Sequence, residues 1–298
     1  SGTSFTMPSM GQMFSSDIKL GSVRDIESSV FVRQAQIGNA DLKPAESTNT
    51  NFGLIYGNNG NRLSFDYWEI DFENRIEGQS AQALLSEDPF GPSITRNELG
   101  DLIGVTTTYF NEESTVLSGI DYGLSTVKSF FNGEVELILQ GTNLIEFLTP
   151  EQSGNGTIMI NRVGKHNFDA HTHSLPKNRI NTFINYKKNK SKYSLIARYL
   201  DGYINNRTIS SKALSLGYKN KVDSSLIFDI SLELPISQYL QINNNSGDYD
   251  LKTSIGIINL FDEKAPRLYN APDFSWDSRL HDPRGRMIRV NFQLIFDN

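Results

Sequence analysis

Three histidines and a carboxylate lie close together in one long polar segment: His166, Asp169, His171 and His173. Imidazole and carboxylate groups are common ligands of transition metals, and imidazole also titrates near neutral pH. In an extended stretch, His171 and His173 would point to the same side. This cluster could hold a metal or a metal chelate, although an exposed polar loop is the more frequent meaning of such a pattern.

Aromatic side chains form a second group with possible chemistry, because they lie in or near long segments without regular periodicity. They are Phe90, Tyr109, Phe110, Phe168, Phe274 and Trp276. Such rings could stack on a ligand, whereas packing of loops against one another is the more frequent use. The candidate ligand-binding residues are therefore His166, His171, His173 and Trp276.

The patterns that would indicate an enzyme are missing from the sequence. There is no cysteine, so there is no thiol nucleophile, cysteine metal site or disulfide. The glycine-rich stretch 153–156 lacks the Lys-Ser/Thr pair of a phosphate-binding loop, and no nucleophile elbow or paired carboxylates stand out. The basic stretch 187–190 is typical of a solvated turn. We predict no catalytic residue, no resident metal and no cofactor.

Length and composition leave several classes open. The chain has 298 residues, a net charge of -6, 38% hydrophobic and 21% charged residues. The mild acidity argues against a protein that binds the nucleic-acid backbone. No apolar run is long enough for a transmembrane helix, but a β-barrel spans a bilayer without one.

Apolar residues recur at every second position through most of the chain, which indicates β-strands. The segments with this pattern are 52–56, 63–72, 116–124, 135–139, 180–186, 193–199, 226–234, 251–257 and 288–296. In one of them the apolar positions shift phase after Tyr67 to Trp68, Ile70 and Phe72, which suggests a bulge or a change of facing. Only residues 25–37 suggest a short helix.

The connections between these segments alternate in length. Short ones at 57–61, 129–133 and 187–191 alternate with long ones at 78–104, 149–176, 203–224 and 261–285. Tight turns on one side and long loops on the other are typical of an outer-membrane barrel, and strands of about ten residues favour a barrel over a soluble sandwich. The link 235–249 is too long for a tight turn, and we have no physical account of it.

Tyrosines near strand ends could lie at the membrane interfaces, or they could be ordinary half-buried strand residues. They are Tyr56, Tyr186, Tyr199 and Tyr203. In a barrel the apolar positions face lipid and the alternating charged positions face the lumen. The predicted lumen-facing residues are Asp121, Glu134, Glu136, Arg179, Arg198, Asp229, Glu233, Lys252 and Arg289.

Five stretches stand out in order along the chain: GTSFTMPS at 2–9, NADLKPAESTN at 39–49, FDYWEIDFENRI at 65–76, SGID at 118–121 and GIINLFDEKAP at 256–266. Together they resemble TonB-dependent outer-membrane receptors, specifically the carboxy-terminal half of their β-barrel. Thr6 and Ala265 depart from the family pattern, and the chain ends Phe296-Asp297-Asn298 where members usually stop at the aromatic residue.

The resemblance implies an all-β, antiparallel transmembrane barrel of 22 strands that surrounds an amino-terminal plug. Because 298 residues cannot form 22 strands and a plug, we expect residues 1–298 to be a partial barrel of the last nine to ten strands, with the plug absent. The start of the chain has no initiator methionine and no signal peptide pattern, which fits a fragment of a longer receptor.

The implied function is uptake of a bulky nutrient across the outer membrane of a Gram-negative bacterium. The family's substrates include siderophore-bound iron, cobalamin-like compounds and oligosaccharides. The implied partners are the outer-membrane lipid bilayer, the TonB complex through the missing plug, the transported ligand and the barrel-assembly machinery, with no nucleic acid. Two alternatives stay open: a passive, porin-like small barrel, and a soluble, secreted all-β binding module.

Overall fold

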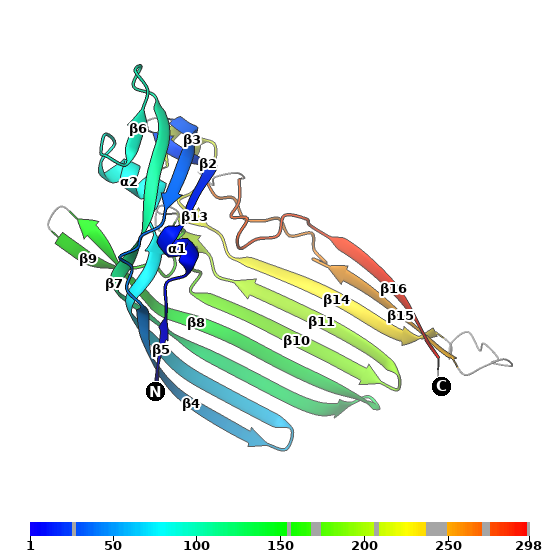
Figure 1. The fold of residues 1–298 in the computed structure, drawn as a ribbon. Coiled ribbons are helices and arrows are strands. Elements are labelled where there is room, and N and C mark those ends of the chain that lie inside the picture. Colours follow the sequence, from blue (N-terminus) through cyan, green and yellow to red (C-terminus); the bar gives the residue numbers. More distant parts are fainter. Residues whose placement is uncertain are drawn as a thin grey trace.

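The chain folds into one large curved β-sheet with a cluster of loops at one end (Figure 1). The computed structural model describes residues 1–25, 28–153, 156–167, 174–205, 209–236, 249–269 and 275–296. The main path of the sheet contains β1 (Gly2–Thr6), β4 (Ala45–Asn58), β5 (Asn61–Gly78), β7 (Leu102–Phe130), β8 (Gly133–Ser153), β10 (Asn178–Lys188), β11 (Ser191–Leu200), β14 (Ser225–Pro235), β15 (Tyr249–Ile258) and β16 (Met287–Phe296).

The remaining elements lie in the connections. They are the strands β2 (Ser16–Asp25), β3 (Ser28–Ile37), β6 (Ile94–Arg96), β9 (Gly156–Asn161), β12 (Tyr203–Ile204) and β13 (Lys221–Val222), and the helices α1 (Met10–Phe14), α2 (Ala81–Glu87) and α3 (Ser211–Ser215). No helix in the described ranges is long and apolar enough to cross a membrane.

Neighbouring strands of the main path are antiparallel, in the order β1-β4-β5-β7-β8-β10-β11-β14-β15-β16. This confirms the all-β, antiparallel fold predicted from the alternation. One pairing departs from it, because β3 pairs in parallel with the first residues of β7. The amino-terminal and carboxy-terminal strands lie at opposite edges of the sheet (Figure 1).

The tight turns predicted at one end of the sheet are confirmed. The backbone φ angle is positive at Asn59 (46°) and Gly60 (80°), and again at Phe131 (43°) and Asn132 (57°). Two consecutive residues with positive φ form the turn type that matches the twist of a β-hairpin. Asn189, with φ of 53°, occupies the third turn. The link 235–249, which is too long for a tight turn, lies mostly outside the described residues.

The long connections contain more regular structure than the sequence suggested. Residues 25–37 do not form the expected short helix: Asp25 is the last residue of β2, and Ser28–Ile37 is strand β3. Val30 and Val32 alternate with Phe31, and β-branched side chains favour a strand when one face is buried. Similarly, the stretch expected to be irregular after residue 149 continues as β8 and then pairs with β9.

The sheet has an apolar face and a polar face, which are defined by the register of its strands. Rows of directly opposite residues share a face. One row of the apolar face is Leu137, Ile184, Leu195, Ile230, Ile257 and Ile288. All nine charged residues predicted to face the lumen lie on the other face, called the polar face below; one of its rows is Glu134, Lys187, Lys192 and Glu233.

The phase shift after Tyr67 is a change of facing. The pairing of β5 with β4 and with β7 keeps one register from Asn61 to Glu73, so no bulge interrupts β5 there. Trp68, Ile70 and Phe72 therefore lie on the polar face, and Glu69, Asp71 and Glu73 lie on the face that was apolar nearer the tight turns. The apolar face thus ends at the row of Tyr67, well before the strands end.

Candidate functional site

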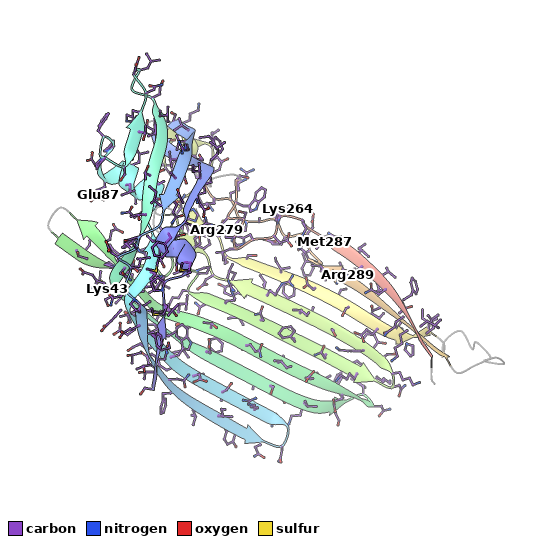
Figure 2. The ribbon with its side chains drawn as sticks, viewed as in Figure 1. Lys43, Glu87, Lys264, Arg279, Met287 and Arg289 are labelled. Atoms are coloured by element: carbon purple, nitrogen blue, oxygen red, sulfur yellow. The ribbon has the colours of Figure 1, made fainter. Side chains whose placement is uncertain are left out.

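The long connections meet at one end of the sheet and form two assemblies (Figure 1). The apolar-core assembly consists of β2, β3, α2, β6 and the first residues of β7. The polar-core assembly consists of the described parts of 161–177, 201–224 and 259–286. Side chains of both assemblies are drawn in Figure 2, where Glu87 marks the end of α2 and Arg279 lies in the second assembly.

The apolar-core assembly has a small hydrophobic core. Buried side chains from four elements pack together: Val23, Val32, Ala81, Leu85, Leu102 and Val105. A register shift between β6 and β7 skips Ile103, so that Leu102 turns toward this core and Ile103 stays half exposed. Ser80 caps α2 by accepting a hydrogen bond from the backbone N–H of Ala83 at 3.2 Å.

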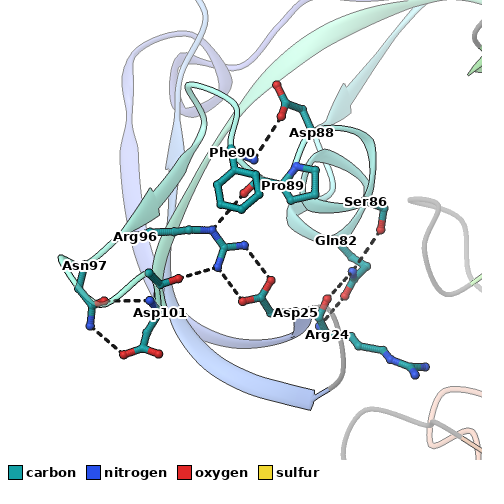
Figure 3. A network of polar contacts seen from close by, with 11 residues as sticks. Arg24, Asp25, Gln82, Ser86, Asp88, Pro89, Phe90, Arg96, Asn97 and Asp101 are labelled. Carbon is teal, nitrogen blue, oxygen red and sulfur yellow. Dashed lines mark hydrogen bonds and ion pairs between the residues drawn. The ribbon is translucent and has the colours of Figure 1, made fainter.

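Arg96 forms several hydrogen bonds at the edge of this assembly (Figure 3). The guanidinium of Arg96 donates to both carboxylate oxygens of Asp25 at 2.8 Å, to the carbonyl of Gly100 at 3.0 Å and to that of Pro89 at 3.2 Å. Its Cζ also lies 4.9 Å from the ring centroid of Phe90. The hydrogen bonds from Arg96 hold the pKa of Asp25 below its usual value.

Nearby, α2 is tied to the end of β2 through an amide. Gln82 accepts from the backbone N–H of Arg24 at 2.7 Å and donates to the carbonyl of Arg24 at 3.1 Å. Figure 3 shows this pair of bonds beside the Asp25–Arg96 contact. The two contacts fix the tip of the β2–β3 hairpin to α2 and β6.

The polar-core assembly is centred on a buried carboxylate. Asp277 accepts from the hydroxyl of Ser174 at 2.5 Å, from the hydroxyl of Tyr203 at 3.2 Å and from the backbone N–H of Arg279 at 3.0 Å. Nδ1 of His166 lies 2.7 Å from Ser174 Oγ and 3.6 Å from Asp277 Oδ2. With the Ser174 proton directed to Asp277, His166 donates to Ser174, which completes a chain of hydrogen bonds across three connections.

The pKa values in this assembly follow from its burial and its bonds. Burial acts to raise the pKa of Asp277, but the contacts with His166 and Ser174 and the N–H of Arg279 outweigh it and hold that pKa well below its usual value. Burial, followed by the nearby charge of Asp277, raises the pKa of Tyr203. Burial lowers the pKa of His281, although Asp277 opposes the shift.

Tyr203 lies between two imidazole rings. Its centroid is 6.4 Å from that of His166 and 6.4 Å from that of His281, with interplanar angles of 22° and 12°. Val222 and Leu268 pack against Tyr203 to form a small apolar shell. Nε2 of His281 is buried and has no hydrogen-bond partner among the described residues. The arrangement holds the loops together.

The predicted site residues have different outcomes. His166 is only 4% exposed, so the expectation of an exposed polar loop is wrong at this position. Trp276 is half-buried in the same assembly. His171, His173, Asp169, Phe168 and Phe274 lie outside the described residues. The ligand-binding role of His166, His171, His173 and Trp276 therefore stays a prediction.

The sequence did not predict the other residues of the polar-core assembly. Ser174 and Asp277 are 103 positions apart, so no local pattern signals their contact. Tyr203 was grouped with the possible interfacial tyrosines, but it is buried in the polar-core assembly, so this interpretation is wrong for that residue. Within the described ranges, no group of three or more His, Cys, Asp or Glu side chains is placed to hold a metal ion.

A second candidate region lies on the polar face of the sheet. A hollow of about 380 Å³ is lined by polar groups that include Asp66, Asp121, Gln140, Arg179 and Asn181. Asp66 and Asp121 are directly opposite each other in the register, and Asp121 accepts from the hydroxyl of Thr142 at 2.5 Å. Oδ1 of Asp66 is buried without a hydrogen-bond partner in the described chain. The hollow thus presents a net negative, hydrogen-bonding surface.

Comparisons with known proteins were consistent with this architecture. The family model "TonB dependent receptor-like, beta-barrel" matches residues 1–260. No curated protein matches the sequence. The solved structure of a ferric enterobactin receptor, PfeA of Pseudomonas aeruginosa, is 13% identical with a TM-score of 0.59, covering 98% of this chain and 37% of that receptor.

Two further structures show the same fold. The siderophore receptor PirA of Acinetobacter baumannii is 16% identical with a TM-score of 0.57, covering 98% of this chain and 38% of that one. The outer membrane transporter YddB of Escherichia coli is 15% identical with a TM-score of 0.53, covering 90% and 35%. The chain therefore spans little more than a third of the length of these structures.

Proposed function

The chain belongs to the TonB-dependent receptor family, and we propose that it is part of an outer-membrane receptor that takes up a bulky nutrient with energy from TonB. Residues 1–298 then form a partial barrel domain, in the outer membrane of a Gram-negative bacterium. Ligand binding and conformational change carry this function, without covalent chemistry. The family match favours it over a passive small barrel and over a soluble binding module.

The observation that supports this proposal is the division of the sheet into two faces. Nine charged side chains predicted to face a lumen share one face, and apolar rows cover the other between the tight turns and Tyr67. In a bilayer, a charge on the lipid face costs roughly 2–4 kcal/mol near the midplane, whereas the lumen face tolerates charge. The loss of the apolar pattern beyond Tyr67 fits strands that leave the hydrocarbon and continue into water.

The polar face also fits an enclosed plug. Arg198 pairs with Asp229 through Nη1–Oδ2 at 2.6 Å, and Asp229 also accepts from the backbone N–H of Asn259. These charges are satisfied within the sheet, while Asp66 and Asp121 are directed into the polar hollow. We infer that this hollow contacts a plug supplied by the same receptor, with the TonB contact on that plug.

For the substrate, we infer siderophore-bound iron as the leading class, ahead of cobalamin-like compounds and oligosaccharides. Two of the similar structures are, by their names, a ferric enterobactin receptor and a siderophore receptor. The ligand would meet the long-connection end, where His166, His171, His173 and Trp276 are the candidates. Titration of the full receptor with ferric enterobactin, followed by tryptophan fluorescence, tests this class. Saturable quenching by cyanocobalamin or an oligosaccharide alone would contradict it.

The membrane role is tested by two neighbouring residues of β16 that lie on opposite faces, and by Phe228 of β14, which shares the apolar face with Ile230. Phe292 is 71% exposed on the apolar face, and Asn291 on the polar face donates to Ser254 at 3.2 Å. In the full receptor, Phe292→Asp and Phe228→Asp should abolish assembly, and Asn291→Asp should be tolerated. Heat-modifiable gel mobility of outer-membrane fractions measures assembly. Equal mobility of all three variants would overturn the assignment of the faces.

A further inference from the structure

Aromatic rings gather on the apolar face beside two of the tight turns. The centroids of Phe130 and Tyr186 are 6.4 Å apart, and those of Tyr186 and Tyr193 are 5.8 Å apart. The hydroxyl of Tyr186 donates to the carbonyl of Phe131 at 3.1 Å, which links the β7–β8 and β10–β11 turns. The ring of Tyr186 lies over Gly133, where an added Cβ would come within 2.5 Å of it.

An apolar hollow begins at these rings. It has a volume of about 480 Å³ and is lined by Tyr186 and Tyr193 and by aliphatic side chains that include Ile184, Leu195 and Ile230. The row of Tyr186 and Tyr193 is the one nearer the turn, and the row of Ile184, Leu195 and Ile230 is the next toward the middle of the sheet. The hollow therefore runs from the tight-turn rim into the apolar face.

Two lysines lie beside the rim of this hollow, both on the side where β10 forms its edge. Lys128 pairs with Val135, which pairs with Tyr186, so Lys128 shares the apolar face with that ring. Lys188 follows Tyr186 by two positions and lies on the same face. Both are exposed, and neither forms an ion pair within the described parts of the chain. Lys187 and Lys192 belong to the polar face, where they are opposite Glu134 and Glu233.

This combination matches one kind of ligand. The apolar hollow suits an acyl chain, and tyrosines are favourable at the boundary between hydrocarbon and water. Two lysines without an ion-pair partner in the described chain suit a phosphate group. The lysines are on β7 and β10, separated by β8, and Lys188 is two positions nearer the turn than the row of Lys128. Their backbones are therefore roughly 12 Å apart, and their long side chains can reach one anion. We propose that the hollow, with Lys128 and Lys188, binds one anionic phospholipid by its acyl chain and phosphate.

The inference rests on the proposed function, because it requires the apolar face to lie in a bilayer. It assigns a role to the basic turn at 187–190 that a merely solvated turn would not have. The two lysines on the apolar face bind the headgroup, and the two on the polar face do not. This difference supplies a matched control with the same loss of charge at the same end of the sheet.

The test uses the full receptor purified in detergent, with dioleoyl phosphatidylglycerol as the probe and native mass spectrometry as the readout. In the Lys128→Gln/Lys188→Gln variant, the retained phosphatidylglycerol should fall roughly tenfold, since each lysine near a membrane surface adds to the attraction of an anionic lipid. The Lys187→Gln/Lys192→Gln variant should retain it as the unmodified receptor does. Glycerol 1-phosphate, which lacks acyl chains, should not be retained.

Three results would overturn the inference: equal loss in both double variants, no loss in either, or retention of glycerol 1-phosphate equal to that of the lipid. Heat-modifiable mobility and the need for detergent are recorded for every protein. A receptor that needs no detergent would refute the proposed function itself. A heat-modifiable, detergent-dependent receptor whose variants bind lipid alike would refute only the phospholipid site.

Discussion

The two loop assemblies stand at the same end of the sheet, but they bury different groups. The apolar-core assembly buries Val32 and Val105 among other aliphatic side chains and keeps its arginine–carboxylate contact at the edge. The polar-core assembly buries the carboxylate itself, with Ser174 and Tyr203 bonded to it and only a thin apolar shell. Polar contacts fasten the first assembly and form the centre of the second.

The difference predicts how each assembly responds to damage. Hydrophobic burial is non-directional and tolerates small shifts of the backbone. A buried hydrogen-bond network depends on every partner, because an orphaned polar group costs its desolvation energy. We therefore expect the polar-core assembly to be lost more abruptly after a single substitution, and to be the one that senses pH.

The largest effect is expected from Asp277→Ala. This change leaves Tyr203 and the N–H of Arg279 without this acceptor inside a buried site, and leaves Ser174 only the carbonyl of His166 at 3.1 Å. The local stability of the assembly should fall by about 3–5 kcal/mol. Hydrogen–deuterium exchange of β12 and β13 in the full receptor measures the loss. Asp277→Asn, which keeps one acceptor oxygen, should lose less, and unchanged exchange in Asp277→Ala would contradict the central role of this carboxylate.

A somewhat smaller effect is expected from Leu85→Ala in the apolar-core assembly. Leu85 is buried in the core on α2, so the truncation leaves a cavity that costs about 2–4 kcal/mol. Faster hydrogen exchange across β2 and β3 would report it. Leu99→Ala removes the same atoms from an exposed position and should change nothing. Equal exchange in the two variants would show that this core does not hold the hairpin.

The sheet and its tight turns show where prediction from sequence succeeds. The tight turns follow from local signals such as Asn59-Gly60, and the two faces of the sheet follow from an alternation that each strand carries by itself. The change of facing after Tyr67 was visible as a phase shift, and the register shows that the strand continues without a bulge. Regular periodicity thus identified the sheet, its turns and its faces.

The loop assemblies are harder to predict from the sequence, because their contacts join residues that are far apart in the chain. The contact between Ser174 and Asp277 and that between Asp25 and Arg96 each connect separate loops, and the types of these residues are common in any polar loop. The hairpin that contains Val30 and Val32 was mistaken for a short helix because its burial depends on α2 and β7, which pack against it from elsewhere in the chain. The packing of α2 and β7 therefore determines the conformation of β3 as much as its own sequence does.

A change of pH should affect the stability of the two assemblies differently. The pKa of His281 is lowered by burial, so the unfolded loops bind a proton more readily than the folded ones, and stability falls as the pH drops below the unfolded value of about 6.5. The other titratable groups that face His281 are Asp277 and Tyr203. The pKa of Asp25 is also lowered, but its unfolded value is about 3.9, so the apolar-core assembly should keep its stability until the pH approaches 4.

Hydrogen exchange at pH 7.5 and at pH 5.5, corrected for intrinsic rates, measures this difference in pH dependence. Exchange should accelerate in β12 and β13 and stay constant in β2 and β3. In His281→Phe the ring that stacks on Tyr203 is kept and the titrating group is removed, so the acceleration should be reduced. An equal acid response in both assemblies would remove the distinction drawn between them.

The smallest effect is expected from Arg96→Lys. This variant tests whether the polar contact at the edge adds only a little to the stability of the apolar-core assembly. Lysine keeps the charge, but it cannot serve both oxygens of Asp25 and the carbonyls of Pro89 and Gly100 with one planar group. The loss should be roughly 1 kcal/mol, because the hydrophobic core beneath is unchanged. Exchange should therefore rise mainly at the hairpin tip near Asp25, with little change around Val32. A loss as large as that of Leu85→Ala would mean that this assembly, too, depends on its polar contact, and the two regions would then differ in composition without differing in what holds them together.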